Sequence, residues 1–122
     1  MIVGIGVDVV DLARFERALS RTPALKPRLF TEAESAGKPL RSLAGRFAAK
    51  EALIKALGES TGVQWHNMQV VADKHGNPSI ELSGAALKLA NDRGVTRVHL
   101  SMSHDAGISI AYVVIESEAG ER

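Results

Sequence analysis

The sequence predicts an α+β domain in which a mostly antiparallel sheet packs against one long helix. Three observations support this fold class. An Ile- and Val-rich segment opens the chain, apolar segments of strand length recur in its second half, and a long run of Ala, Leu, Lys and Glu lies between them. With 122 residues the chain fits one domain, so we treat 1–122 as a single unit with its own core.

The first segment, residues 2–10, alternates with a period of two and therefore predicts a strand. We expect its Ile and Val side chains to form the packed face. Gly4, Gly6 and Asp8 then lie on the other face. Because glycine has no side chain, another group can approach the backbone closely there.

Two helices are predicted before the long one. The first covers 12–21, with Asp11 as its N-cap. The second is a short helix that opens with a capping-box pattern from Thr31 to Glu34. The buried positions of the first helix recur at i, i+3 and i+7, and they are Leu12, Phe15 and Leu19.

The strongest helical segment covers 43–57, where good helix formers dominate. We expect Ser42 to cap its start and Gly58 to end it. After it the sequence predicts, in order, a hairpin of strands 68–72 and 79–82 around a turn at 74–78, a helix from Ser83 or Gly84 to Gly94, a strand at 97–102, a turn at 103–107 and a strand at 108–115.

Composition excludes several functional classes. The chain has 15 Lys and Arg against 14 Asp and Glu, so its net charge of +1 gives no global field for nucleic acid. It has no cysteine, which excludes disulfides, thiolate metal sites and cysteine nucleophiles. We find neither a signal peptide nor an apolar run near the roughly 20 residues of a membrane span. We therefore expect a soluble cytoplasmic protein that acts at no membrane.

Motifs exclude further classes of enzyme. Ser103, His104 and Asp105 are adjacent in sequence, which is not how a serine-hydrolase triad is assembled. The phosphate-binding loop of P-loop enzymes is absent, and the histidines do not have zinc-ligand spacing. His104 in its predicted turn remains a candidate for phosphate contact or proton transfer, although most turn histidines are simply solvated.

Asp8, Glu51 and Lys55 are the candidates for metal and phosphate chemistry. Glu51 and Lys55 share one helix face, and one interpretation is a surface ion pair worth only about 0.3–0.5 kcal/mol. Asp8 lies within an Ile/Val strand, where a buried carboxylate is costly unless it is paired or binds a cation. Mg²⁺ takes one or two protein carboxylates and fills its other positions with water and substrate phosphate. The alternative, in which Asp8 faces solvent or caps a neighbouring backbone, stays open.

A ridge of arginines on the 12–21 helix is the most basic local feature, and it consists of Arg14, Arg17 and Arg21. One interpretation is a solvated helix face. The other is a docking surface for an acidic helical partner, with Ala18 and Leu25 offering apolar contact between the charges.

Three segments together resemble the holo-acyl-carrier-protein synthase family. They are Ile5–Phe15, Arg46–Gly58 and Leu100–Asp105, and their order and spacing are similar to that family's over almost the whole chain. The resemblance implies the 4′-phosphopantetheinyl transferase fold. It also implies transfer of 4′-phosphopantetheine from coenzyme A to a serine of apo acyl carrier protein, with adenosine 3′,5′-bisphosphate as the by-product.

The resemblance further implies roles for individual residues. The metal-binding Asp and Glu of the family fall on Asp8 and Glu51, and its phosphate-facing lysine falls on Lys55. The carrier dock falls on Arg14 and the helix around it. Short members of the family are usually homotrimers with active sites between subunits. The coenzyme A pocket falls on Arg46, Gly58, Gly76, Pro78, Ser103 and His104.

Two other functions stay open at this point. A different Mg²⁺ enzyme that hydrolyses a pyrophosphate-containing nucleotide would release product from coenzyme A without any carrier. A trimeric binding module without activity would bind the carrier independently of Mg²⁺. The joint presence of Asp8, Glu51 and Lys55 favours the transferase, while the physiological carrier and the general base are not determined by the sequence.

Overall fold

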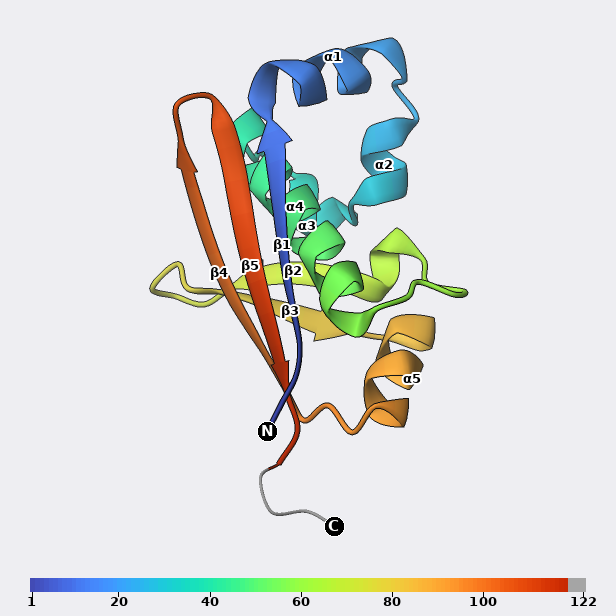
Figure 1. The fold of residues 1–122 in the computed structure, drawn as a ribbon. Coiled ribbons are helices and arrows are strands. Elements are labelled where there is room, and N and C mark those ends of the chain that lie inside the picture. Colours follow the sequence, from blue (N-terminus) through green and yellow to red (C-terminus); the bar gives the residue numbers. More distant parts are fainter. Residues whose placement is uncertain (119–122) are drawn as a thin grey trace.

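The computed structural model describes residues 1–118. In this part of the chain the strands form two antiparallel sheets beside the long helix α4 (Figure 1). The larger sheet has the order β1-β5-β4, and the smaller one pairs β2 with β3. The predicted fold class is confirmed, but the strands are divided between two sheets. The strands are β1 (Ile2–Asp11), β2 (Met68–Ala72), β3 (Pro78–Leu82), β4 (Arg97–Asp105) and β5 (Ile108–Glu116).

The predicted helices occur in the predicted order, but the structure adds two short helical segments that were not predicted, α2 around Pro27 and the 3₁₀ turn η1. Asp11 accepts a hydrogen bond from the backbone N–H of Arg14 and so caps α1, and the capping box of Thr31 and Glu34 opens α3. None of the helices within residues 1–118 is long and apolar enough to span a membrane. The helices are α1 (Leu12–Arg21), α2 (Leu25–Leu29), α3 (Glu32–Ser35), α4 (Leu40–Leu57), the 3₁₀ turn η1 (Trp65–Asn67) and α5 (Gly84–Asp92).

Two predicted boundaries were wrong. Helix α4 begins at Leu40 with Pro39 as its N-cap, so Ser42 is not the cap but lies in the first turn. The predicted turn at 103–107 contracts to Ala106 and Gly107, which both have positive φ, as in the two-residue turn of a tight hairpin. Strands β4 and β5 pair as far as this turn, so Ser103 and His104 lie on a strand.

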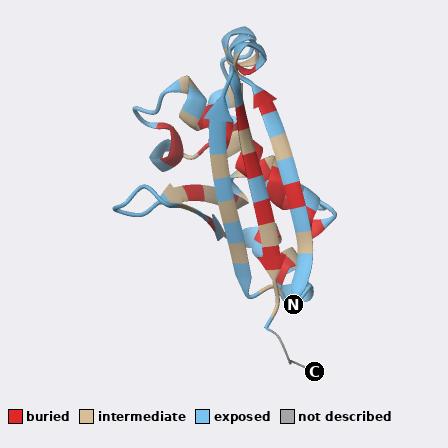
Figure 2. Ribbon diagram, turned by 60° about the vertical axis from the view of Figure 1, so that its left-hand side comes forward, coloured by how far each residue is buried: buried red, intermediate tan, exposed pale blue. Residues whose placement is uncertain are grey.

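Strand β1 packs on α4 through its small residues. A Cβ atom added at Gly4 would collide with the carbonyl oxygen of Ala56, and one added at Gly6 would collide with that of Ala52. The Ile and Val residues of β1 that alternate with Gly4, Gly6 and Asp8 are largely exposed in the single chain, whereas Val10, on the same face as the glycines, is buried (Figure 2). The predicted assignment of the two faces was therefore wrong, because a helix this close can be met only by residues without side chains. The exposed residues include Ile5, Val7 and Val9.

The core lies between α4 and the three-stranded sheet. The central strand β5 directs Ala111, Val113 and Ile115 into it, and all three are fully buried. From α4, Ala48 and Ala52 are also fully buried and allow the close approach to the sheet. The close packing fixes the distance between α4 and β1. It therefore also fixes how side chains from the two elements lie relative to one another.

The β1–α4 contact predicts a large cost for Gly6→Ala. The added methyl group meets backbone, which cannot rotate away, so we expect a loss of about 2–4 kcal/mol in the free energy of unfolding. Gly76→Ala is the control: its φ of +81° strains an alanine, but nothing lies within 4 Å of the added Cβ. That variant should lose only about 1 kcal/mol. Urea unfolding followed by the fluorescence of Trp65 measures both, and equal losses would contradict the close contact.

Candidate active site

The β1–α4 contact brings Asp8 and Glu51 to the wall of one cleft, together with Lys55. Asp8 follows Gly6 on the same face of β1, so it is directed to the side along which α4 runs. The Lys55 ammonium lies 3.1 Å from Asp8 Oδ1 and also donates to the carbonyl oxygen of Val7 at 3.0 Å. The Asp8 side chain is only 18% exposed, whereas that of Lys55 is 54% exposed. The solvent-facing alternative for Asp8 is thus wrong.

Glu51 has a shifted pKa. Burial raises the pKa of its carboxyl group, the charge of Asp8 raises it further, and Lys55 opposes the shift. The pair of carboxylates therefore has more negative charge than one lysine offsets. Hard oxygen ligands of this kind fit Mg²⁺. Within residues 1–118 no third acidic or histidine side chain lies close enough to share a metal ion with them, so substrate and water would have to complete the coordination of a metal here.

The cleft has a volume of about 490 Å³, and most of its wall is apolar. The ring of Phe47 lines it, 5.4 Å from the ring of Phe15 and 5.5 Å from that of Trp65. Sequence reasoning missed this aromatic wall, although Phe47 shares a helix face with Glu51. The lining residues are Asp8, Val9, Val10, Asp11, Arg14, Phe15, Ala18, Leu25, Leu29, Phe47, Glu51 and Lys55.

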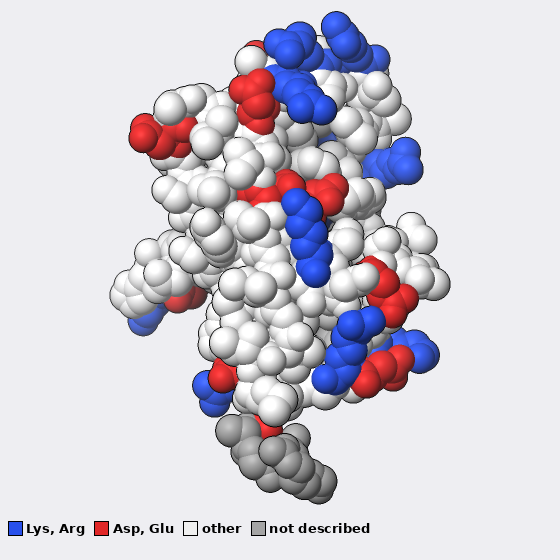
Figure 3. Space-filling view, in the orientation of Figure 1, with Lys and Arg blue, Asp and Glu red and all other residues white. Residues whose placement is uncertain are grey.

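Three residues of the predicted carrier dock, Arg14, Ala18 and Leu25, line this same cleft. Arg17 and Arg21 do not line it, but both are exposed on α1. Figure 3 shows basic side chains gathered over α1 at the top of this face. The structure thus places part of the arginine ridge at the cleft that holds Asp8 and Glu51, which the sequence could not show.

A second hollow, of about 130 Å³, opens beside β4 and the first turns of α4. We call it the basic hollow, and Arg41, Arg46, Ser103 and His104 are among its lining residues. Arg46 lines this hollow, and its Nε atom is buried without a hydrogen-bond partner among the described residues. An unsatisfied buried donor is costly, so this nitrogen indicates a place for an anion. Sequence reasoning left Arg41 unassigned because the 30–42 loop matched no motif.

The cleft and the basic hollow share no lining residue and lie at opposite edges of the three-stranded sheet. Helix α4 passes from one to the other. Its first turns lie near β4, where Gly45 faces the side chain of Met102, and its last turns lie against β1. Among the described residues of one chain, the predicted phosphate contacts are therefore separated from the predicted metal pair.

The remaining predicted coenzyme A residues line neither hollow. Gly58 ends α4 with a φ of +84°, at the end of the helix that packs on β1. Gly76 and Pro78 belong to the β2–β3 hairpin, which extends on the β4 side of the sheet in both ribbon views (Figures 1 and 2). The six predicted residues thus fall into a β1-side group and a β4-side group.

A buried ion pair between Lys50 and Glu34 was missed by sequence reasoning. The two charged groups are 2.8 Å apart and neither side chain is exposed. Burial lowers the pKa of Lys50, and the hydrogen bond that Lys50 donates to Glu34 opposes this shift. A signal was present, because Lys50 lies seven residues after Leu43 and seven before Leu57, in the apolar phase of the helix.

The comparisons with known proteins decide the family. A sequence model of the 4′-phosphopantetheinyl transferase superfamily matches residues 4–113. The chain belongs to this superfamily. One similar transferase is a holo-(acyl-carrier-protein) synthase from Leifsonia xyli subsp. xyli, which is 60% identical over 119 residues and matches 98% of this chain and 100% of its own length.

Solved structures of phosphopantetheinyl transferases share the fold. The holo-(acyl-carrier-protein) synthase of Neisseria meningitidis superposes with a TM-score of 0.86 and 40% identity, covering 96% of this chain and 100% of its own. The synthase of Helicobacter pylori, solved in complex with coenzyme A, has a TM-score of 0.81 and 30% identity and covers 92% and 99%. The predicted family and its fold are confirmed.

The raised pKa of Glu51 predicts that Glu51→Gln stabilises the metal-free transferase at neutral pH. The folded-state pKa lies above the unfolded value, so the ionised carboxylate weakens folding at neutral pH, and this effect disappears as the pH falls through the raised pKa. In a chelator, Glu51→Gln should therefore melt above the wild type at neutral pH, with the gap closing in acid. Added Mg²⁺ should raise the melting temperature of the wild type and not that of Glu51→Gln.

Glu59→Gln is the matched control for this experiment. Glu59 is an exposed glutamate whose pKa is lowered by hydrogen bonds from Thr61 and Arg93. Its replacement should slightly lower the melting temperature at neutral pH and leave the response to Mg²⁺ intact. A Mg²⁺ response of the same size in Glu51→Gln and in the wild type would contradict the metal assignment.

Proposed function

We propose that Asp8 and Glu51 hold Mg²⁺ while this chain transfers 4′-phosphopantetheine from coenzyme A to a serine of apo acyl carrier protein. The transfer itself is the activity of relatives that are 60% identical over nearly the whole chain. Binding of coenzyme A is supported by the Helicobacter pylori synthase, solved with that molecule. The observation that supports the residue assignment best is the group of Asp8, Glu51 and Lys55 in one cleft.

The chemistry explains why this group suits the reaction. Breaking the pyrophosphate bond of coenzyme A leaves negative charge on phosphoryl oxygens, so the site must supply positive charge at fixed positions. Mg²⁺ would supply most of it. The Lys55 ammonium, now paired with Asp8, would turn to a phosphoryl oxygen once a cation shares that carboxylate. The nucleophile is the serine of the carrier, so this chain needs none.

The carrier would dock at the cleft and on α1. Arg14 lines the cleft, and Arg17 and Arg21 are exposed beside it on the same helix. Such a ridge suits an acidic helical partner, for which charge complementarity guides the approach. Ala18 and Leu25 would then contact apolar side chains of the carrier, which brings its serine near Asp8 and Glu51.

The basic hollow would receive phosphate groups of coenzyme A. Arg46, with its unpartnered Nε, is the principal donor, and Ser103 and His104 reach the same hollow from β4. The β2–β3 hairpin with Gly76 and Pro78 extends on this side of the sheet and would contact the nucleotide end. Planar guanidinium groups bind phosphate in a bidentate manner, which suits this role.

We further propose that each active site is shared between two chains of a homotrimer. The cleft and the basic hollow lie at opposite sheet edges, so a second chain can bring its hollow to the cleft of the first. The exposed apolar face offers the contact surface, with Ile5 65%, Val9 53% and Tyr112 51% exposed. An edge that meets the opposite edge of its neighbour forms a closed ring when the rotation between neighbouring chains closes on itself. The resemblance implies three subunits in that ring.

The reaction predicts that an apo acyl carrier protein gains the mass of phosphopantetheine only when coenzyme A, Mg²⁺ and this protein are all present. Mass spectrometry of a panel of carriers measures this gain. Asp8→Ala and Glu51→Ala should each lower turnover by at least about a thousandfold while circular dichroism shows a folded chain. Wild-type rates in both variants would contradict the metal pair. Product released from coenzyme A without a carrier would instead indicate a pyrophosphate hydrolase.

A shared active site predicts that two inactive variants restore each other. Asp8→Ala damages the cleft at the β1 edge and Arg46→Ala damages the basic hollow at the β4 edge, so a mixed ring contains some sites in which both are intact. After mixing, dissociation and reassembly in equal amounts, about a quarter of the sites should be intact. Mixing Asp8→Ala with Glu51→Ala is the control and should restore nothing, because both changes affect the same side. No recovery in the first mixture would contradict a shared site.

A further inference from the structure

Lys50 is a fully buried lysine that uses all of its hydrogen-bond donors. Its ammonium group donates to the carbonyl oxygen of Leu29 at 2.6 Å, to Glu34 Oε1 at 2.8 Å and to the carbonyl oxygen of Trp65 at 3.2 Å. An ammonium group has three N–H donors, so none is left for a substrate or for water. The ring of Phe30 covers it at 5.2 Å. Lys50 therefore acts within the fold and not on a ligand.

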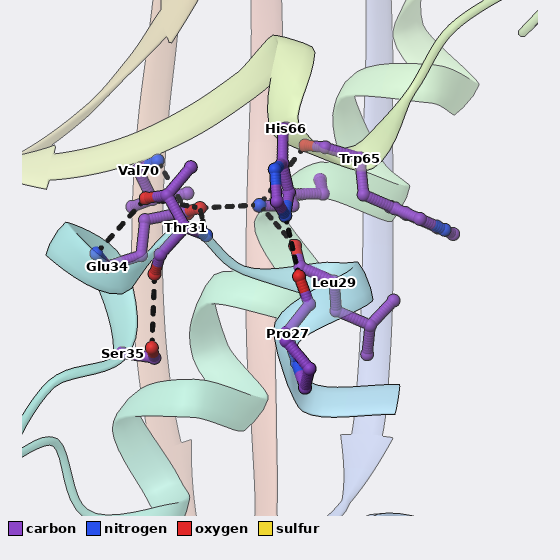
Figure 4. Close-up of polar contacts among 9 residues, drawn as sticks. Pro27, Leu29, Thr31, Glu34, Ser35, Trp65, His66 and Val70 are labelled. Carbon is purple, nitrogen blue, oxygen red and sulfur yellow. Dashed lines mark hydrogen bonds and ion pairs between the residues drawn. The ribbon is translucent and has the colours of Figure 1, made fainter. Parts of the chain in front are cut away.

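Glu34 is equally well partnered. Its Oε1 atom accepts from the backbone N–H of Thr31 at 3.0 Å, and its Oε2 atom accepts from that of Val70 at 3.0 Å (Figure 4). The pair therefore joins α4 to four separate segments: the end of α2, the start of α3, η1 and β2. The acceptors of Lys50 lie 15 to 21 residues from it in sequence, so no local helical rule positions them.

Stability does not explain why this position carries a charged pair. Well-packed apolar residues can often replace a buried ion pair at no cost in stability, since removing two charges from water is expensive. An apolar side chain at position 50, however, would leave the carbonyl groups of Leu29 and Trp65 without their donor. The ammonium group fixes the positions of these two carbonyls relative to α4, which an apolar contact would leave free to shift.

Of the two segments held by Lys50, α2 lines the cleft and η1 supports its wall from behind. Leu29 lines the cleft directly, and the ring of Trp65 supports that of Phe47, which also lines it. Helix α2 has only five residues, and its main neighbours are α1 and η1. A short contact between His66 Nε2 and the carbonyl oxygen of Pro27, 2.7 Å, joins α2 to η1. Lys50 then joins both of them to α4.

We propose that Lys50, held by Glu34, is a positioning residue for the acyl carrier protein. By fixing α2 and η1 against α4 it sets the shape of the apolar wall on which the carrier docks. This inference rests on the proposed docking of the carrier at the cleft. Asp8 and Glu51 are placed by the β1–α4 contact, in which Lys50 takes no part. Loss of Lys50 therefore affects binding of the carrier and leaves the chemical step and the coenzyme A site intact.

Steady-state kinetics of the full chain with coenzyme A, Mg²⁺ and an apo acyl carrier protein test this inference. Lys50→Met should raise the KM for the carrier about tenfold or more, with kcat at saturating carrier within about threefold of the wild type and the KM for coenzyme A unchanged. Lys88→Met, which removes an exposed lysine paired with Asp92 on α5, is the matched control and should change none of these values.

A merely structural role would give a different pattern. Ile115→Val, at the end of β5 remote from the cleft, weakens the core and should lower the active fraction without changing either KM. The same pattern in Lys50→Met, or an unchanged KM for the carrier, would overturn the proposal. Lys50→Met leaves the buried carboxylate of Glu34 unpaired, which can prevent folding. In that case the double variant Glu34→Gln/Lys50→Met, which removes this charge, is measured in its place. The same changes in kcat and KM then decide the question.

Direct binding separates this inference from the proposed function. Fluorescence anisotropy of a labelled apo carrier, without coenzyme A, should show about tenfold weaker binding to Lys50→Met than to the wild type. A wild type that binds the carrier but never modifies it would overturn the proposed function alone. Equal affinities in the two proteins would overturn the role of Lys50 alone, and a wild type that binds no carrier would overturn both.

Discussion

The close approach of β1 to α4 is the constraint on which the rest of the structure depends. Gly4 and Gly6 leave no side chain between the strand and the carbonyl groups of Ala56 and Ala52. Asp8 follows on the same face and so reaches the helix that carries Glu51. The same packing leaves Ile5, Val7 and Val9 of β1 exposed. One backbone contact thus builds the carboxylate pair and also exposes the apolar face through which we propose that the chains assemble.

Helix α4 distributes the functional groups because successive residues of a helix point about 100° apart. Arg46 is directed to the basic hollow beside β4, Lys50 into the interior, and Glu51 to the cleft. A single rigid element therefore connects the anion site, the wall of the cleft and the metal pair. Movement of α4 relative to β1 would disturb all of them at once, which is why small residues line the contact.

The sequence predicted most elements, and its errors have physical causes. The capping box at Thr31 and the stop at Gly58 depend on neighbouring residues, so local pattern was sufficient. The cap at Ser42 was wrong because Pro39, three residues earlier, already starts the helix. Lys50 was missed because its acceptors come from segments 15 to 21 residues away, beyond the reach of any helical pattern.

The sequence by itself determined which residues share a face, the order of the family segments, and hence the candidates Asp8, Glu51 and Lys55. Periodicity fixes such groupings because backbone geometry alternates side chains regularly. It does not say which partner covers each face. Only the tertiary structure decided that the glycine face of β1 is the buried one, that the cleft and the basic hollow lie at opposite edges, and that Lys50 is enclosed. Each of these depends on contacts between residues distant in sequence.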